Sequence, residues 1–170
     1  FHLLLGSVAD SDASGCSSAT GSSLVWTCNR DGGEPRHLEP GIWAWSNGGP
    51  GHEWPKTQRL TLALTASVCG PDFDGETQTR LLEALADTAP APDERLPNTG
   101  IGLERERALS SPFIPVQRLS AGALYGTRAS TIVRVARNQS LHWLERSFYP
   151  DGSQIDRSES FQIQSLGVLS

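Results

Sequence analysis

Cysteine thiols and histidine rings are the side chains of this 170-residue sequence with the most reactive chemistry. The three cysteines are Cys16, Cys28 and Cys69. Their number is odd, and no two of them form a Cys-x-x-Cys pair, so the spacing does not predict a disulfide framework. We interpret them as buried thiols and expect the protein to lie in the cytoplasm, where thiols stay reduced.

The four histidines are equally dispersed, at His2, His37, His52 and His142. None belongs to a His-x-His or His-Glu-x-x-His motif, so we predict no metal site and no cofactor. His52 precedes Glu53 and follows Asn47 by five positions. It is therefore the histidine that we expect to lie near a binding cleft.

The composition excludes two classes of partner. A net charge of −5 and the lack of a Lys/Arg cluster argue against nucleic-acid binding, which depends on neutralising phosphates. The longest apolar run, residues 60–68, is interrupted by Thr61, Thr65 and Ser67 and is too short to span a membrane.

The first half of the chain predicts strands followed by two helices. The expected strands cover residues 1–8 and 22–29, and a further strand pair covers residues 37–46 around Pro40-Gly41. The first helix is expected to begin near Trp54, with Pro55 at its first position, and to end before Gly70-Pro71. Asp74 is a predicted cap for the second helix. The inner face of the second helix should comprise Leu81, Leu82, Leu85 and Ala86. The inner face of the first helix should comprise Leu60, Leu64 and Val68.

The second half predicts a surface loop and closing strands. Residues 89–102 contain three prolines and should form the loop, followed by one helical turn at 103–107 and an irregular segment at 111–119. Strands are expected at 130–137, 140–148 and 159–163, with a turn at Tyr149-Pro150-Asp151-Gly152. Strands, helices and strands in this order favour an α+β fold, which we assign to one domain, residues 1–170.

Three motifs in a shared order resemble a known family. They are Gly33-Glu34-Pro35 with Pro40-Gly41-Ile42-Trp43-Ala44-Trp45-Ser46-Asn47, then Trp54-Pro55-Lys56, then Tyr125-Gly126-Thr127-Arg128. The last motif continues to Glu145-Arg146-Ser147-Phe148 and Asp151-Gly152. This pattern is similar to the Asn-Arg-Asp-Glu (NRDE) family, also called transport and Golgi organisation protein 2. The tripeptide Asn29-Arg30-Asp31 is not the family's namesake motif, because Gly32 stands in place of Glu.

The resemblance implies a four-layer αββα sandwich of the N-terminal-nucleophile-hydrolase type, with two antiparallel sheets. It also implies an N-terminal cysteine nucleophile, whose own α-amino group serves as the base. Phe1 cannot be that nucleophile, and the cysteines of this chain are internal. We therefore expect the fold to be incomplete at its N-terminus, the upstream segment of the same protein to supply the nucleophile, and these 170 residues to be inactive alone.

The resemblance also implies site residues, each with a structural alternative. Asn47 would help to hold an oxyanion, or would only stabilise a turn. Arg128 would bind a carboxylate or oxyanion in the same cleft, or would form a salt bridge. Tyr125 and Thr127 are the expected binding residues beside it, and Trp45 lines an apolar site or packs in the core.

Two functions follow from the resemblance. The first is hydrolysis of an amide or thioester bond in a small molecule. The alternative is a non-catalytic binding or trafficking protein for an apolar ligand such as haem, a lipid or an acyl-CoA.

Overall fold

The computed structural model describes residues 1–7, 23–29, 33–47, 53–68, 73–118, 122–136 and 138–163. The chain divides into two compact units. The first unit comprises Phe1–Gly41, Thr131–Leu144 and Arg157–Ser170, and the second comprises Ile42–Ser130 and Glu145–Asp156. Helices and antiparallel sheets are mixed, as the sequence predicts.

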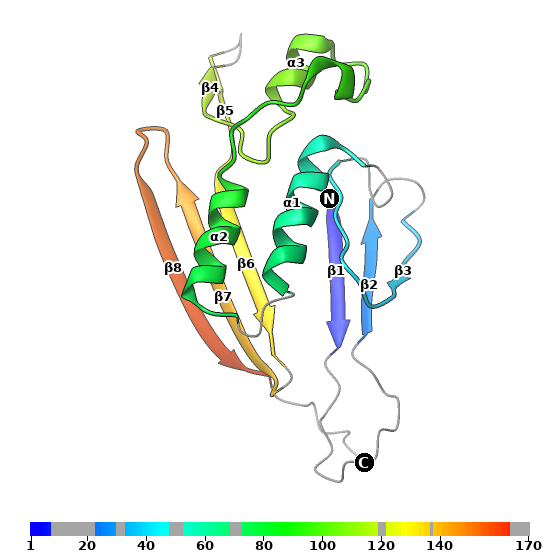
Figure 1. Cartoon of the computed structure of the whole chain (residues 1–170), viewed down its shortest axis with the longest axis vertical. Coiled ribbons are helices and arrows are strands. Elements are labelled where there is room, and N and C mark those ends of the chain that lie inside the picture. Colours follow the sequence, from blue (N-terminus) through cyan, green and yellow to red (C-terminus); the bar gives the residue numbers. More distant parts are fainter. Residues whose placement is uncertain are drawn as a thin grey trace. The chain divides into compact units, whose positions relative to one another are not determined.

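The first unit contains a three-stranded sheet in the order β1-β2-β3 (Figure 1). Strand β1 covers His2–Ser7, β2 covers Ser23–Cys28 and β3 covers Arg36–Leu38. In the register of the sheet, Leu4 pairs with Trp26 and Trp26 pairs with Arg36. Trp26 and Cys28 are buried on one face of β2, and the His2 ring stacks on Trp26 with 5.7 Å between the ring centres.

The predicted second strand of the 37–46 pair is wrong. β3 ends at Leu38, and residues 42–46 belong to neither a helix nor a strand. The apolar residues that suggested a strand instead lie beside the first helix of the second unit. A short apolar run predicts burial, but it does not specify whether a strand or a helix provides the covering surface.

Helices α1 and α2 of the second unit contact each other and lie side by side in Figure 1. Helix α1 covers Pro55–Val68 and α2 covers Gly75–Leu85. Asp74 caps α2 as predicted, because its Oδ1 accepts a hydrogen bond of 2.8 Å from Thr77 N. Leu81 and Leu82 are buried as expected, but Val68 and Ala86 are exposed because each lies at the end of its helix.

The predicted surface loop 89–102 is tied to the helices at several points. Arg59 on α1 donates to Asp87 Oδ2 at 2.8 Å and to Ala89 O at 2.6 Å. Ala91 is buried, and its N–H donates to Ser110 Oγ at 2.8 Å. The loop also contains a 3-10 turn, η1, at Asp93–Arg95, and helix α3 follows at Leu103–Ala108, where a helical turn is predicted.

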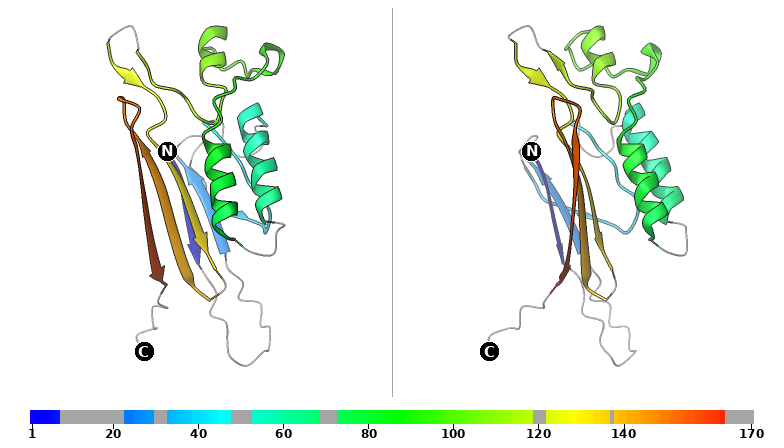
Figure 2. Two further views of the ribbon diagram at one scale, coloured as in Figure 1. Left: turned by 60° about the vertical axis from the view of Figure 1, so that its left-hand side comes forward. Right: turned by 90° about the vertical axis from the view of Figure 1, so that its left-hand side faces the viewer.

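The remaining strands form two further antiparallel sheets (Figure 2). A two-stranded sheet joins β4, Gln117–Arg118, to β5, Leu124–Tyr125, and β4 lies in the segment 111–119 that is predicted to be irregular. The third sheet has the order β6-β7-β8, with bounds Ala129–Val135, Ser140–Phe148 and Gln154–Gln162. The turn at Tyr149 forms as predicted, with Gly152 N donating to Tyr149 O at 3.0 Å and Gly152 at a φ of 85°. Strand β8 begins earlier than predicted.

Candidate functional site

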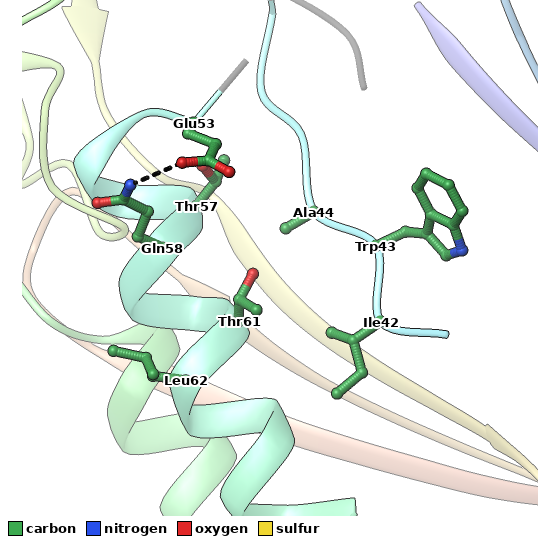
Figure 3. Close-up of a pocket in the computed structure, with 8 residues that line it drawn as sticks. All are labelled: Ile42, Trp43, Ala44, Glu53, Thr57, Gln58, Thr61 and Leu62. Atoms are coloured by element: carbon green, nitrogen blue, oxygen red, sulfur yellow. Dashed lines mark hydrogen bonds between the residues drawn. The ribbon is translucent and has the colours of Figure 1, made fainter. Parts of the chain in front are cut away.

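A groove of about 480 Å³ lies between the extended segment 42–44 and helix α1, entirely within the second unit (Figure 3). Its lining residues are Ile42, Trp43, Ala44, Glu53, Thr57, Gln58, Thr61 and Leu62. A second hollow of about 240 Å³ shares five of these residues and adds Trp45, Leu60 and Leu64. The volume of the larger hollow lies within the range of small-molecule sites.

One face of α1 forms a wall of both hollows. Thr57, Thr61 and Leu64 follow one another at helical spacing, so their side chains project from the same side of the helix. Leu60 and Leu62 flank this row. The wall therefore combines leucines with threonine methyl groups.

Internal hydrogen bonds reduce the polarity of this helix. Thr57 Oγ1 donates to Trp54 O at 2.8 Å, and Thr65 Oγ1 donates to Thr61 O at 2.7 Å. The Thr61 hydroxyl has no hydrogen-bond partner among the residues that the structure describes, and it lies on the groove side of α1 in Figure 3. Thr61 therefore offers one polar contact in a mostly apolar wall.

The opposite wall is the extended segment that follows Gly41. Side chains alternate along extended backbone, so Ile42 and Ala44 project toward α1 while the ring of Trp43 is directed away from it (Figure 3). Trp45, which the sequence predicts as a binding residue, lines the second hollow. The apolar run that suggested a strand thus places Ile42 and Ala44 beside α1.

The upper end of the groove in Figure 3 is polar. Gln58 Nε2 donates to Glu53 Oε2 at 3.3 Å, which orients both side chains at the rim. The amide oxygen of Gln58 accepts from Arg95 and points away from segment 42–44 (Figure 3). Among the described residues that line the groove, Glu53 is the one with a charged side chain.

The Trp54-Pro55-Lys56 motif has a different neighbourhood. Lys56 Nζ lies 5.4 Å from the centre of the Trp54 ring and donates to Leu109 O at 3.0 Å, at the end of α3. Burial lowers the pKa of Lys56 below that of an ordinary lysine, and the Glu106 carboxylate partly opposes this shift. These contacts join the start of α1 to the end of α3.

The Tyr125-Gly126-Thr127 motif holds two backbone segments together. Thr127 N donates to Ile114 O at 2.9 Å, and Thr127 Oγ1 accepts from Ile114 N at 2.9 Å. A Cβ on Gly126 would lie 3.0 Å from Val116 Cα, so the close approach requires glycine. Tyr125 pairs with Gln117 on β4 and is exposed. The predicted binding role of Tyr125 and Thr127 stays a prediction, since the described contacts are structural.

The two predicted supporting residues of catalysis both lie in the second unit. Asn47 is exposed, in a turn at the end of segment 33–47. Arg128 is exposed just before β6, and its carbonyl accepts from Phe148 N at 2.8 Å. Its guanidinium has no salt bridge within the described ranges, and both readings of Arg128 stay predictions. No hydrogen bond or ion pair in the same ranges joins Asn47 to Arg128, so their shared cleft stays a prediction.

Reactive groups are few in the part of the chain that the structure covers. Cys28 is a buried thiol, while Cys16, Cys69 and the candidate His52 lie outside the described residues. Among the described residues, no group of His, Cys, Asp and Glu could hold a metal ion. The described geometry therefore provides a binding surface and no nucleophile beside it.

Four residues that line the groove were not predicted from the sequence as site residues, namely Glu53, Gln58, Thr61 and Leu62. Helical spacing from Pro55 could have placed Thr57, Thr61 and Leu64 on one face. Nothing in the sequence showed that this face lies beside residues 42–45 rather than beside another helix.

Comparisons with known proteins agree with the motifs. The sequence model of one family, described as Transport and Golgi organisation 2, matches residues 1–150. No curated protein matches the chain. Within the described residues, no helix has both the length and the apolar character needed to cross a membrane.

Proposed function

The chain belongs to the Transport and Golgi organisation 2 family, and on this premise we propose that it binds an apolar small molecule in the groove beside α1. The observation that carries the proposal is the groove itself, a hollow of about 480 Å³ between Ile42 and Leu62. Its walls are mostly apolar and its few polar groups lie at defined positions, which is the usual character of a ligand site. Binding needs no reactive side chain, in keeping with the residues that line the groove.

Leu62 provides the sharpest test, because its side chain is 71% exposed and can be changed without opening the core. We expect Leu62→Asp to weaken binding of the neutral fluorophore N-phenyl-1-naphthylamine about tenfold or more, since a charge would interrupt the apolar wall. The matched control is Leu103→Asp, on an exposed leucine of α3 outside the groove. Equal binding by both variants, or no binding by the unmodified chain, would contradict the proposal.

Haem and a long-chain acyl-CoA are the natural-ligand classes that the family resemblance suggests, and we include both in the titration. A saturable 1:1 complex without turnover supports a binding or trafficking protein. Flat titrations with every apolar ligand count against it. The cytoplasm is the proposed setting, and fractionation of cells that contain the protein tests it.

A second candidate is hydrolysis of an amide or thioester bond, which the exposed Arg128 guanidinium favours. A guanidinium without a salt bridge in the described ranges is available to an oxyanion or carboxylate. Under this proposal Asn47 adds an amide donor, and an upstream N-terminal cysteine of the same protein supplies the nucleophile. The coding sequence should then begin Met-Cys, and chloroacetamide should label that cysteine. A different second residue would refute the hydrolase.

We further propose that the antiparallel sheets belong to a four-layer αββα sandwich of the N-terminal-nucleophile type. The family resemblance and the mixture of antiparallel strands with paired helices support this architecture. A crystal structure in which the two three-stranded sheets do not face each other would contradict it.

A further inference from the structure

We infer that the groove beside α1 selects an apolar ligand that carries a positive charge, and that Glu53 is the residue that sets this preference. The inference rests on the proposed binding function and names the ligand class for the same site. Its basis is the juxtaposition of one carboxylate with an otherwise uncharged, mostly apolar lining.

The lining determines the apolar part of the ligand. Ile42 and Ala44 project from one side, and Leu62 lies on the other. The adjoining hollow continues the apolar surface with Leu60 and Leu64. A flat or branched hydrocarbon body therefore buries apolar surface against both walls, which is the main source of affinity in such a site.

Glu53 determines the charged part. Its carboxylate lies at one end of the groove, and Gln58 Nε2 holds one of its oxygens at 3.3 Å. The other oxygen, Oε1, has no hydrogen-bond partner among the residues described. A ligand ammonium group can donate to this oxygen, while a ligand carboxylate or phosphate at the same end would be repelled.

Arg95 is a cation that contacts this rim, and its position leaves the expected preference for a cationic ligand in place. Its guanidinium binds the amide oxygen of Gln58, on the side of Gln58 that points away from segment 42–44 (Figure 3). Arg95 is not a lining residue, so Gln58 separates it from the groove. A ligand in the groove meets the carboxylate of Glu53 before the guanidinium.

The Thr61 hydroxyl adds a second polar contact along the same wall. It lies one helical turn after Thr57, on the groove side of α1. A ligand with a hydrogen-bonding group between its apolar body and its cationic end would satisfy both positions. Anionic ligands, including haem and acyl-CoA, rank below such a cation in this groove.

Three probes with one apolar body separate charge from shape: 2-naphthylmethylamine, 2-naphthylmethanol and 2-naphthoate. We expect the amine to bind about fivefold more tightly than the alcohol, and the carboxylate about fivefold more weakly, because an exposed charge pair contributes up to about 1 kcal/mol. Dissociation constants from ligand-observed NMR at low salt measure the order, since salt screens such pairs.

Glu53→Gln should remove the advantage of the amine over the alcohol and leave the affinity for the alcohol within about twofold. Glu94→Gln, on the exposed η1 turn outside the lining, is the matched control and should retain the order. Equal affinities of the three probes, tighter binding of the naphthoate, or an unchanged order in Glu53→Gln would overturn the charge inference while the binding site stands. Failure of all three probes to bind would instead refute the proposed function.

Discussion

The two units bury different kinds of side chain. In the second unit, the buried side chains include polar groups with hydrogen bonds, such as Thr77, Glu106 and Ser110. In the first unit, the buried residues Trp26 and Cys28 lie on one strand, while the neighbouring strand β1 exposes its leucines. Both units contain β-strands, so the presence of strands alone does not explain why their buried side chains differ.

This difference shows that directional contacts fix the loops of the second unit. A buried polar group is costly without a partner, so each such group specifies one geometry. The first unit depends more on the backbone ladder of β1, β2 and β3, which tolerates side-chain changes at exposed positions. The following predictions test this contrast, from the largest expected effect to the smallest.

Leu82→Ala should lower the free energy of unfolding by about 2–5 kcal/mol, since Leu82 is 7% exposed and its loss leaves a cavity. Leu5→Ala on β1 is the matched change in the first unit, where Leu5 is 57% exposed. Its cost should stay below about 1 kcal/mol. Urea denaturation followed by circular dichroism measures both, and equal losses would abolish the contrast between the units.

Glu106→Ala should destabilise the chain by about 1–2 kcal/mol, because the carboxylate accepts hydrogen bonds from both the N–H and the hydroxyl of Thr99. Glu104→Ala alters an exposed carboxylate of the same helix and should change stability by less than about 0.5 kcal/mol. Thermal unfolding compares the two variants. Indistinguishable melting curves would show that the Thr99 contacts do not stabilise this region.

Asp74→Ala should cost about 1 kcal/mol, because Thr77 N loses its cap at the start of α2. Asp74→Ser retains an oxygen at the cap and should recover most of that stability. Urea denaturation followed by helical circular dichroism measures the loss of stability. If Asp74→Ser were as unstable as Asp74→Ala, the side-chain cap would make no contribution to stability.

Asp87 should make the second unit sensitive to acid. A hydrogen bond from Ala89 N, and then the Arg59 guanidinium, lower the pKa of Asp87 below its ordinary value of 3.8. Because the pKa of Asp87 is lower in the folded than in the unfolded state, its ionised form stabilises the fold at pH values above the unfolded-state pKa. This stabilisation is lost as the pH falls through the folded-state pKa. Asp87→Asn should therefore lose less stability than the unmodified chain between pH 7 and pH 3.

Arg59→Gln separates the two causes of that shift. It removes the guanidinium but leaves the hydrogen bond from Ala89 N, which is the larger cause. Arg59→Gln should therefore retain more of the acid dependence than Asp87→Asn. Equal behaviour of the two variants in denaturant titrations at both pH values would show that the guanidinium dominates.

Local chemistry made several elements predictable. Pro55 suits the first position of a helix, and Asp74 accepts from Thr77 N, so the starts of α1 and α2 follow from residues close in sequence. The turn at Tyr149 likewise needs a residue such as Gly152 that accepts a positive φ. The family was also recognisable from the order of its motifs, and the family match over residues 1–150 confirms this assignment.

The groove was not predictable in the same way. The apolar run at residues 42–45 predicted that this segment would contact another element, and α1 was recognised from its periodicity. The packing of this segment against α1 depends on contacts between residues distant in sequence, which local sequence rules do not predict. The same packing positions Glu53 and Gln58 at the rim of the groove.

By itself, then, the sequence determined the family, the helix starts and the tight turns, because each depends on short-range geometry or on residue order. Tertiary structure alone decided that residues 42–46 form no strand and that Thr127 holds Ile114. An extended segment becomes a strand only when another strand lies within hydrogen-bonding reach, and here the neighbouring surface is a helix. The walls of the candidate site therefore come from packing between distant residues.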